Sequence, residues 1–180
     1  MNTESQQRST LRLVLIFCMA LSKAKPTKFS TVLVALCWIG ATRGTRFAGK
    51  RPTNIGVQSG RLAPCPGTPN CVNSQSQDAQ HRIKPLTYNS TPTQAIADLK
   101  TVIQNLERTK IITETENYLY AEFMSAFWGF VDDVEFLLDE SAKVIHVRSA
   151  SRLGKSDMGV NRKRIESIRA KLKDLRNGQL

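Results

Sequence analysis

The side chains that could act as acids, bases or ligands are concentrated between positions 132 and 164. They comprise acids, a histidine, arginines and hydroxyl groups: Asp132, Asp133, Glu135, His146, Arg148, Ser149, Ser151 and Arg152. A loop with a glycine at each end, Gly154 to Gly159, leads from them into an amphipathic helical pattern. Such a loop can hold an anion through the backbone N–H groups of the helix N-terminus, with arginines beside it. The sequence therefore predicts an anion site here.

The predicted anion site draws on the end of a strand, the loop and the first turn of the helix. Its residues are Arg148, Ser149, Ser151, Arg152, Ser156, Asp157, Asn161 and Arg162. The expected ligand is an anionic small molecule or an acidic protein partner. A plainer interpretation is that Asp132, Asp133 and Asp157 neutralise the arginines and nothing binds. The loop also lacks the Lys-Ser/Thr that ends a nucleotide-binding P-loop.

A catalytic role is the alternative to a non-catalytic binding or assembly module. Asp133, Glu135 and His146 form a charged face, and hydrolysis would need a nucleophile, a base and an oxyanion site. Ser149 or Ser151 could be paired with His146, but neither lies in a nucleophile-elbow context. We therefore assign no catalytic residue and no cofactor. A small hydrolase or thiol-redox enzyme would require a pocket that encloses the charged face.

The cysteines at Cys65 and Cys71 lie outside the N-terminal segment, which holds Cys18 and Cys37. Six positions apart, among prolines and a glycine, the pair should form a disulfide in an oxidising compartment. A metal site with His81 is the rival interpretation, but three ligands are one fewer than structural zinc takes. Free or redox-active thiols are the third, although no CxxC motif is present. We assign no metal site.

Two runs with alternating polarity, Phe130 to Leu138 and Val144 to Ala150, predict a β-hairpin around a polar turn. The expected register pairs Leu138 with Lys143, Phe136 with Ile145, Val134 with Val147, Glu135 with His146, and Asp133 with Arg148. A slip of one residue would exchange the two faces of the strand, so the alternation should fix the register.

Helical patterns flank the strands. A capping box at Thr91 to Gln94 begins a helix expected to run from Pro92 to Arg108. A second begins at Asn161, whose side chain can cap it. Between them lie predicted strands at Lys110 to Glu116 and Tyr118 to Ser125, then the hairpin; His81 to Leu86 could add an edge strand. This order predicts an α+β domain with an antiparallel sheet of about four to five strands flanked by the two helices.

The net charge of +11 belongs largely to the N-terminal part of the chain. Residues 1–60 carry nine basic residues against a single acidic one, Glu4. The basic face of the last helix is typical of a solvated surface. Nucleic-acid binding through it would have to weaken steeply with salt, and we expect no nucleic-acid partner.

A targeting segment is predicted at residues 1–42, followed by a linker at 43–61 and a single domain at 62–176. Lysines precede the uncharged run Phe29 to Thr42, which at ~1.5 Å per residue spans about 21 Å, less than the roughly 30 Å hydrocarbon core. This favours a signal-peptide h-region. An uncleaved membrane anchor, a true start near Met19, and a buried helix of a cytoplasmic protein are the alternatives. We expect export to the thylakoid lumen or periplasm, with membrane contact through this segment.

Three strings of the sequence resemble, in order, the bacterial and plastid family called domain of unknown function 1499. They are CPGTPNCVNS, AEFMSAFWGFVDDVEF and RSASRLGKSDMGVNRKRIESIR, and the resemblance covers about Leu62 to Leu175. The string GVQSGRLAPCPGTPNC is similar to cyanobacterial members. The resemblance implies an exported or thylakoid-associated domain, and it carries no established reaction.

Overall fold

The predicted antiparallel sheet is the centre of the fold. The computed structural model describes residues 48–178, so the predictions made for the N-terminal targeting segment lie outside the described residues. The elements are, in chain order, β1 (Val57–Gln58), β2 (Arg61–Leu62), β3 (Cys71–Asn73), β4 (Leu86–Thr87), α3 (Pro92–Gln104), β5 (Thr109–Glu114), β6 (Tyr118–Met124), β7 (Val131–Asp139), β8 (Val144–Ser151) and α4 (Val160–Arg176). The α+β prediction is confirmed.

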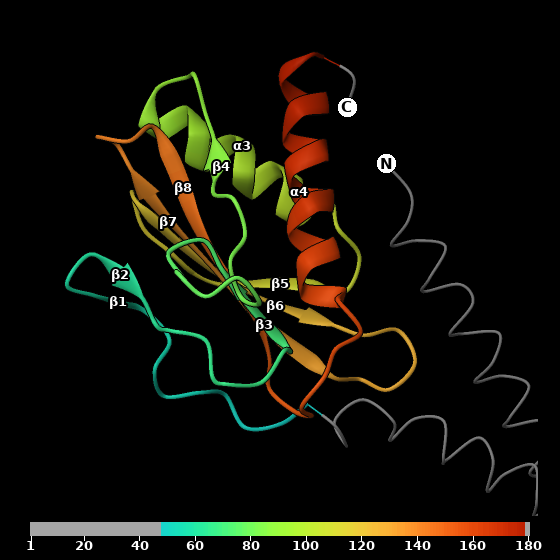
Figure 1. The fold of residues 1–180 in the computed structure, drawn as a ribbon. Coiled ribbons are helices and arrows are strands. Elements are labelled where there is room, and N and C mark those ends of the chain that lie inside the picture. Colours follow the sequence, from blue (N-terminus) through green and yellow to red (C-terminus); the bar gives the residue numbers. More distant parts are fainter. Residues whose placement is uncertain (1–47, 179–180) are drawn as a thin grey trace, which may run out of the picture. The chain divides into compact units, whose positions relative to one another are not determined.

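The sheet has six strands, slightly more than predicted, in the order β3-β8-β7-β6-β5, with β4 also paired to β8. Helices α3 and α4 pack on one face and bury the main apolar core there. The two-stranded ribbon of β1 and β2 lies over the other face (Figure 1), where Leu62 packs with Tyr118, Tyr120 and Leu137. The sheet therefore separates an apolar layer from a second, more polar one.

The register predicted for the β7–β8 hairpin is wrong by two residues. Phe136 pairs with Val147 and Leu138 with Ile145, so Glu135 lies opposite Arg148. The loop is Glu140 to Lys143, whereas the expected register allows a two-residue loop at Glu140-Ser141 or a four-residue loop from Asp139 to Ala142. Asp139 accepts hydrogen bonds from Ser141 and Ala142, and Lys143 adopts a left-handed φ of 51°. A shift of two residues keeps every side chain on its face, so the alternation could not detect it.

The first predicted helix is confirmed at its start and is shorter than expected at its end. The hydroxyl of Thr91 accepts a hydrogen bond from the N–H of Gln94 at 3.2 Å, as an N-cap should. The helix ends at Gln104, because Arg108 takes a positive φ of 56° and the hydroxyl of Thr109 donates to the carbonyls of Ile103 and Leu106. Because the helix ends early, residues 105–108 form the turn that leads into β5.

The last helix begins at Val160, and Asn161 does not cap it. The carboxylate of Asp157 accepts hydrogen bonds from the N–H groups of Gly159 at 2.9 Å and Asn161 at 2.8 Å. A carboxylate suits the positive end of the helix dipole better than an amide, and Gly159 supplies the φ of 77° that the turn requires. The side chain of Asn161 is thereby free to reach into the domain.

Strand β3 was not predicted from the sequence, and only Leu86 of the predicted edge strand at His81 to Leu86 lies in β4 (Leu86–Thr87). Pro85 lacks the N–H group that a longer ladder would need. Part of the predicted linker also lies on the sheet: Arg51 donates to Glu122, and the N–H of Gly56 donates to Glu135 at 2.7 Å. We call residues Gly49 to Leu62, which cover this face, the strap. No helix among residues 48–178 is long and apolar enough to span a membrane.

Candidate functional site

The predicted anion site divides between the two faces of the sheet. Arg148 and Arg152 bond to carboxylates on the face under the strap, whereas Ser149, Ser151 and Asn161 lie on the face packed by α4. Successive side chains of a strand point to opposite faces, and β8 contributes to both. The structure therefore does not bring these residues to one place.

The N-terminus of α4 is already occupied by the carboxylate of Asp157. Burial raises the pKa of Asp157, but hydrogen bonds from Asn161 and Gly159 outweigh it and hold that pKa below its usual value. An external anion would therefore meet a bound negative charge at the helix end. Ser156 is exposed on the adjoining loop.

Asn161 ties the helix start to the sheet. Its side-chain oxygen accepts a hydrogen bond from Ser149 at 2.5 Å, and its amide donates to Ser151 and to the carbonyl of Asn70. The asparagine is fully buried, so these bonds satisfy a polar group that would otherwise be costly. We assign the two serines and Asn161 a structural role.

The arginines of α4 are also engaged with the protein. Arg162 donates to the carbonyls of Arg82 and Gln80, and Arg164 pairs with Asp132. Arg169 and Arg176 donate to carbonyls of the segment from Lys84 to Thr87. These contacts match the plainer interpretation, in which the charges of this region neutralise or brace one another.

A buried ionic network lies under the strap, and the sequence pattern indicated only part of it. It consists of side chains from β6, β7, β8 and the residue that follows β8: Tyr118, Tyr120, Glu122, Asp133, Glu135, Arg148 and Arg152. The alternation Tyr118-x-Tyr120-x-Glu122 is the signal that we overlooked, because it places three polar groups on the face of Asp133 and Glu135. We call this set the ionic network.

The first half of the ionic network centres on Arg152. Its guanidinium donates to Asp133 at 2.7 Å and to Glu122, and the hydroxyl of Tyr120 donates to Asp133 at 2.6 Å. Hydrogen bonding to Asp133 is the main cause that raises the pKa of Arg152. The guanidinium of Arg51 covers Glu122 at 2.6 Å from the strap.

The second half centres on Glu135, which is fully buried. It accepts hydrogen bonds from Tyr118 at 2.8 Å, from Arg148 at 3.2 Å and from the N–H of Gly56 at 2.7 Å. Burial, with the adjacent Glu135, raises the pKa of Tyr118 far above its usual value, so the phenol stays protonated and donates. The Nε of Arg148 has no hydrogen-bond partner among the described residues.

His146 lies apart from the ionic network, although the sequence grouped it there. Its Nδ1 is 3.2 Å from the hydroxyl of Ser74, and its Nε2 is 3.8 Å from a carboxylate oxygen of Asp139. The same hydroxyl accepts a hydrogen bond from the N–H of Val147 at 2.9 Å. Burial lowers the pKa of His146, against the opposite effect of Asp139. Ser74 is a partner that no pattern in the sequence indicated.

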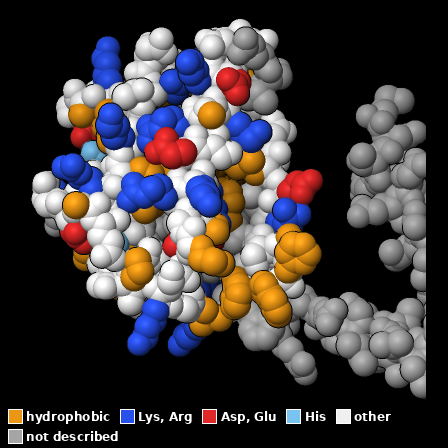
Figure 2. Space-filling model, turned by 45° about the vertical axis from the view of Figure 1, so that its right-hand side comes forward, with side chains coloured by type: hydrophobic (Ala, Val, Ile, Leu, Met, Phe, Trp, Pro, Cys, Tyr) orange, Lys and Arg blue, Asp and Glu red, His pale blue; other side chains and the backbone are white. Residues whose placement is uncertain are grey.

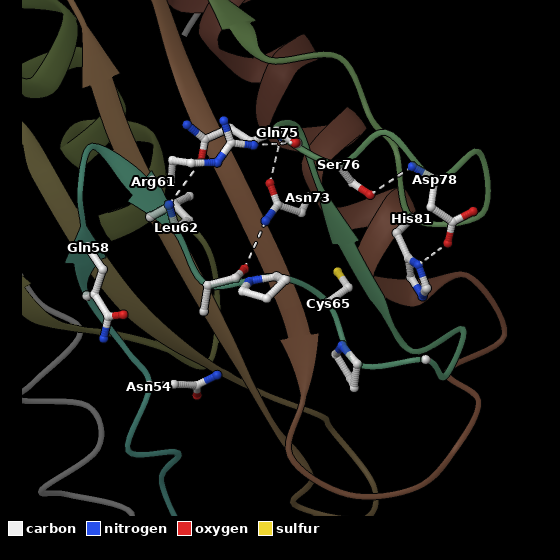
Figure 3. A pocket seen from close by; sticks show the side chains of 15 residues that line it. Asn54, Gln58, Arg61, Leu62, Cys65, Asn73, Gln75, Ser76, Asp78 and His81 are labelled. Carbon is white, nitrogen blue, oxygen red and sulfur yellow. Dashed lines mark hydrogen bonds and ion pairs between the residues drawn. The ribbon is translucent and has the colours of Figure 1, made fainter.

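The cleft that we take as the candidate site lies between the strap and the disulfide loop (Figure 3). It has a volume of about 560 Å³. Its lining includes the side chains of Asn54, Gln58, Arg61, Gln75, Asp78 and His81. His146, Asp133 and Arg152 are not among its lining residues. This cleft is therefore not the pocket that an enzyme built on the charged face would require.

The two walls of the cleft are held by internal bonds. Asn73 donates to the carbonyl of Ala63, and Gln75 accepts from the N–H of Leu62, which fixes the end of the strap. On the far wall, His81 bonds to Asp78 at 2.5 Å and to the carbonyl of Thr68 at 3.0 Å. The side chains of Asn73, Gln75 and His81 therefore hold the walls of the cleft in place.

Three polar side chains of the cleft keep hydrogen-bonding capacity. Among residues 48–178, Arg61 donates a single side-chain hydrogen bond, to the carbonyl of Gln75 at 2.8 Å. Figure 3 shows the amides of Asn54 and Gln58 without bonds to the other residues drawn, and neither forms a side-chain hydrogen bond to any other described residue. Together they offer one cation and two amides to a ligand.

Cys65 and Cys71 are joined in a disulfide with a Cα–Cα distance of 5.7 Å. Cys65 lies in the cleft wall, while Cys71 is buried in β3. His81, the third ligand of the rival metal interpretation, is bonded to Asp78 and Thr68 instead. Among residues 48–178, no group of three or more His, Cys, Asp or Glu side chains is arranged to hold a metal ion.

Comparison of the chain with known protein families identifies the family of this α+β domain. The family described as "Protein of unknown function (DUF1499)" matches residues 61–172, which is more than half of the chain. The chain belongs to this family. No curated protein matches the chain.

Removing one acid of the ionic network should destabilise the domain strongly. In Asp133→Ala, Arg152 loses its main partner while still buried, which typically costs roughly 3–5 kcal/mol. The matched control is Glu166→Ala, which removes the exposed partner of Arg169 and should cost about 0–1 kcal/mol. Urea denaturation measures both, and equal losses in the two variants would contradict a buried network.

Acid should weaken the domain in part through Glu122. Burial raises the pKa of Glu122, but hydrogen bonds from Arg152 and Arg51 outweigh it and keep that pKa below 4.5. A lowered folded-state pKa stabilises the fold above the unfolded-state pKa, and this contribution disappears as the pH falls through the folded-state value. Melting temperatures measured from neutral pH to about pH 2 should therefore fall less in Glu122→Gln than in the wild type. Parallel curves would assign the acid sensitivity to other groups.

Proposed function

We propose that this domain is an exported, non-catalytic binding module whose ligand site is the cleft beside the disulfide. The observation that carries the proposal is the set of polar groups with spare hydrogen-bonding capacity, Arg61, Asn54 and Gln58, in the wall of a cleft of about 560 Å³. The surrounding walls are held by hydrogen bonds and the disulfide, so a ligand would meet a preformed surface.

An anionic ligand fits this cleft best. Arg61 is the basic residue among the lining residues, and the acid Asp78 is engaged by His81. A guanidinium with free N–H groups suits a carboxylate or phosphate, and the two amides can bond to the polar remainder of the ligand. We expected an anionic ligand at the N-terminus of α4, and we now propose the same class of ligand for the cleft.

Anion binding should depend on Arg61. A panel of small carboxylates and phosphate esters is screened by thermal shift, and one present at a hundred times its dissociation constant should stabilise the wild type by ~2.7 kcal/mol. In Arg61→Ala this stabilisation should be lost, because the cation is removed. The matched control is Arg162→Ala, which also removes an arginine that donates to backbone carbonyls.

The control also tests the original anion site. If an anion stabilises Arg61→Ala as well as the wild type but no longer stabilises Arg162→Ala, the ligand lies at the N-terminus of α4. If no anion in the panel shifts the melting temperature of the wild type, recognition of a small anion fails.

Export is supported by the basic and apolar N-terminal sequence and by a cysteine pair in disulfide geometry, which suits an oxidising compartment. A fusion of residues 1–60 to a reporter should leave the cytoplasm, because lysines followed by an apolar run direct secretion. The same fusion without residues 29–42 is the control and should stay inside. A full fusion that accumulates in the cytoplasm would contradict export.

A further inference from the structure

Several large apolar side chains are exposed at one end of the domain. In the loop between β6 and β7, Phe127 is 93% exposed and Trp128 is 66% exposed. In the loop between β8 and α4, Met158 is 88% exposed and Leu153 is 42% exposed. We call these four residues the apolar end. Exposed apolar groups of this size that cluster together mark an interaction surface.

The two loops of the apolar end leave the sheet side by side. Asp132 pairs with Ser151 at the start of β7 and the end of β8, and the N–H of Arg152 donates to the carbonyl of Val131 at 3.2 Å. Both loops project from the lower end of the sheet in Figure 1. In Figure 2, hydrophobic side chains gather at the lower edge of the domain.

The N-terminal part of the described chain reaches the same end. Gly49 packs so closely on the second loop that a Cβ added to it would lie 3.0 Å from the Cβ of Arg152 and 3.1 Å from the Cγ of Leu153. The uncharged, mostly apolar run of residues 29–42 stops seven positions before Gly49. The apolar run therefore precedes, by only a few residues of sequence, a segment that packs at the apolar end.

The charges around the apolar end are predominantly basic. Lys50 and Lys155 are exposed there, and Lys163 is exposed in the first turn of α4. Among the nearby acids, Glu122 pairs with Arg51 and Arg152, and Asp132 pairs with Arg164, while Asp157 is held by the backbone N–H groups of Gly159 and Asn161. Arg43 and Arg46 add two further positive charges between the apolar run and Gly49. Anionic lipid headgroups attract such a set of basic groups.

We propose that the apolar end rests on a lipid bilayer, with Phe127 and Trp128 in the interfacial region. Aromatic side chains favour this depth, because their rings are apolar while the indole N–H can still bond to headgroups or water. The cleft, which the disulfide loop and the strap enclose, takes no part in this contact.

The test follows the fluorescence of Trp128 in the full-length chain. Trp38→Phe leaves Trp128 as the single tryptophan. On vesicles of phosphatidylcholine and phosphatidylglycerol, its emission should shift to the blue, and lipids that carry a quencher near the headgroup should remove most of it. The matched control is Trp38→Phe/Trp128→Phe/Ser141→Trp, which moves the tryptophan to the exposed β7–β8 turn; its emission should stay unshifted and unquenched.

Three results would overturn the proposal. In the first, the emission of Trp128 does not shift when vesicles are added, and an aqueous quencher still reaches it. This result counts whether the chain stays in solution or sediments with the vesicles. The second is emission that is already blue-shifted and protected without lipid, which would mean that another part of the chain covers the apolar end. The third is protection by a native membrane extract but not by protein-free vesicles, which would assign the surface to a protein partner.

Discussion

Burial of the ionic network is the constraint on which the rest of this domain depends. Two arginines and three acids lie together on one face of the sheet, and a buried charge is tolerated only when it is paired and hydrogen-bonded. The sheet alone does not complete the network, because Glu135 and Glu122 take further bonds from Gly56 and Arg51 of the strap. The polar face of the sheet thus holds the strap in place.

The strap in turn forms one wall of the cleft. Its Asn54, Gln58 and Arg61 face the disulfide loop, and Leu62 packs on the tyrosines of the ionic network. The family match begins at Arg61, so most of the strap precedes the matched residues. The strap nevertheless completes the ionic network, whose other residues lie within the match. In the strap wall of the cleft, Arg61 therefore lies within the matched region, whereas Asn54 and Gln58 precede it.

The apolar face of the sheet has a simpler role. Helices α3 and α4 cover it with aliphatic side chains, and Asn161 fastens the start of α4 to β8 through Ser149. This packing sets the position of the β8–α4 loop, and with it Leu153 and Met158 of the apolar end. One sheet thus carries a cleft at one place and an exposed apolar end at another, without shared residues.

Much of the fold could be predicted, because local patterns specify it. Thr91 and Pro92 start α3, alternation marks β6 to β8, and the short spacing of Cys65 and Cys71 brings the sulfur atoms within reach. Less of the candidate site could be predicted. Arg148 and Arg152 were recognised, but their partners lie 13 and 19 positions earlier, and a register error of two residues assigned Asp133 to the wrong arginine.

Sequence patterns were enough to predict the two helices and their apolar faces, the strands β5 to β8 and the family, and they favoured the cysteine pair. These follow from interactions between residues that are near in the chain, or from periods that a strand or helix imposes. Tertiary packing was needed to show which arginine meets which acid, that Asp157 occupies the end of α4, and that the strap lies on the sheet. Those outcomes depend on strand register and on contacts across 70 or more positions, such as Arg51 with Glu122, and no local pattern encodes them.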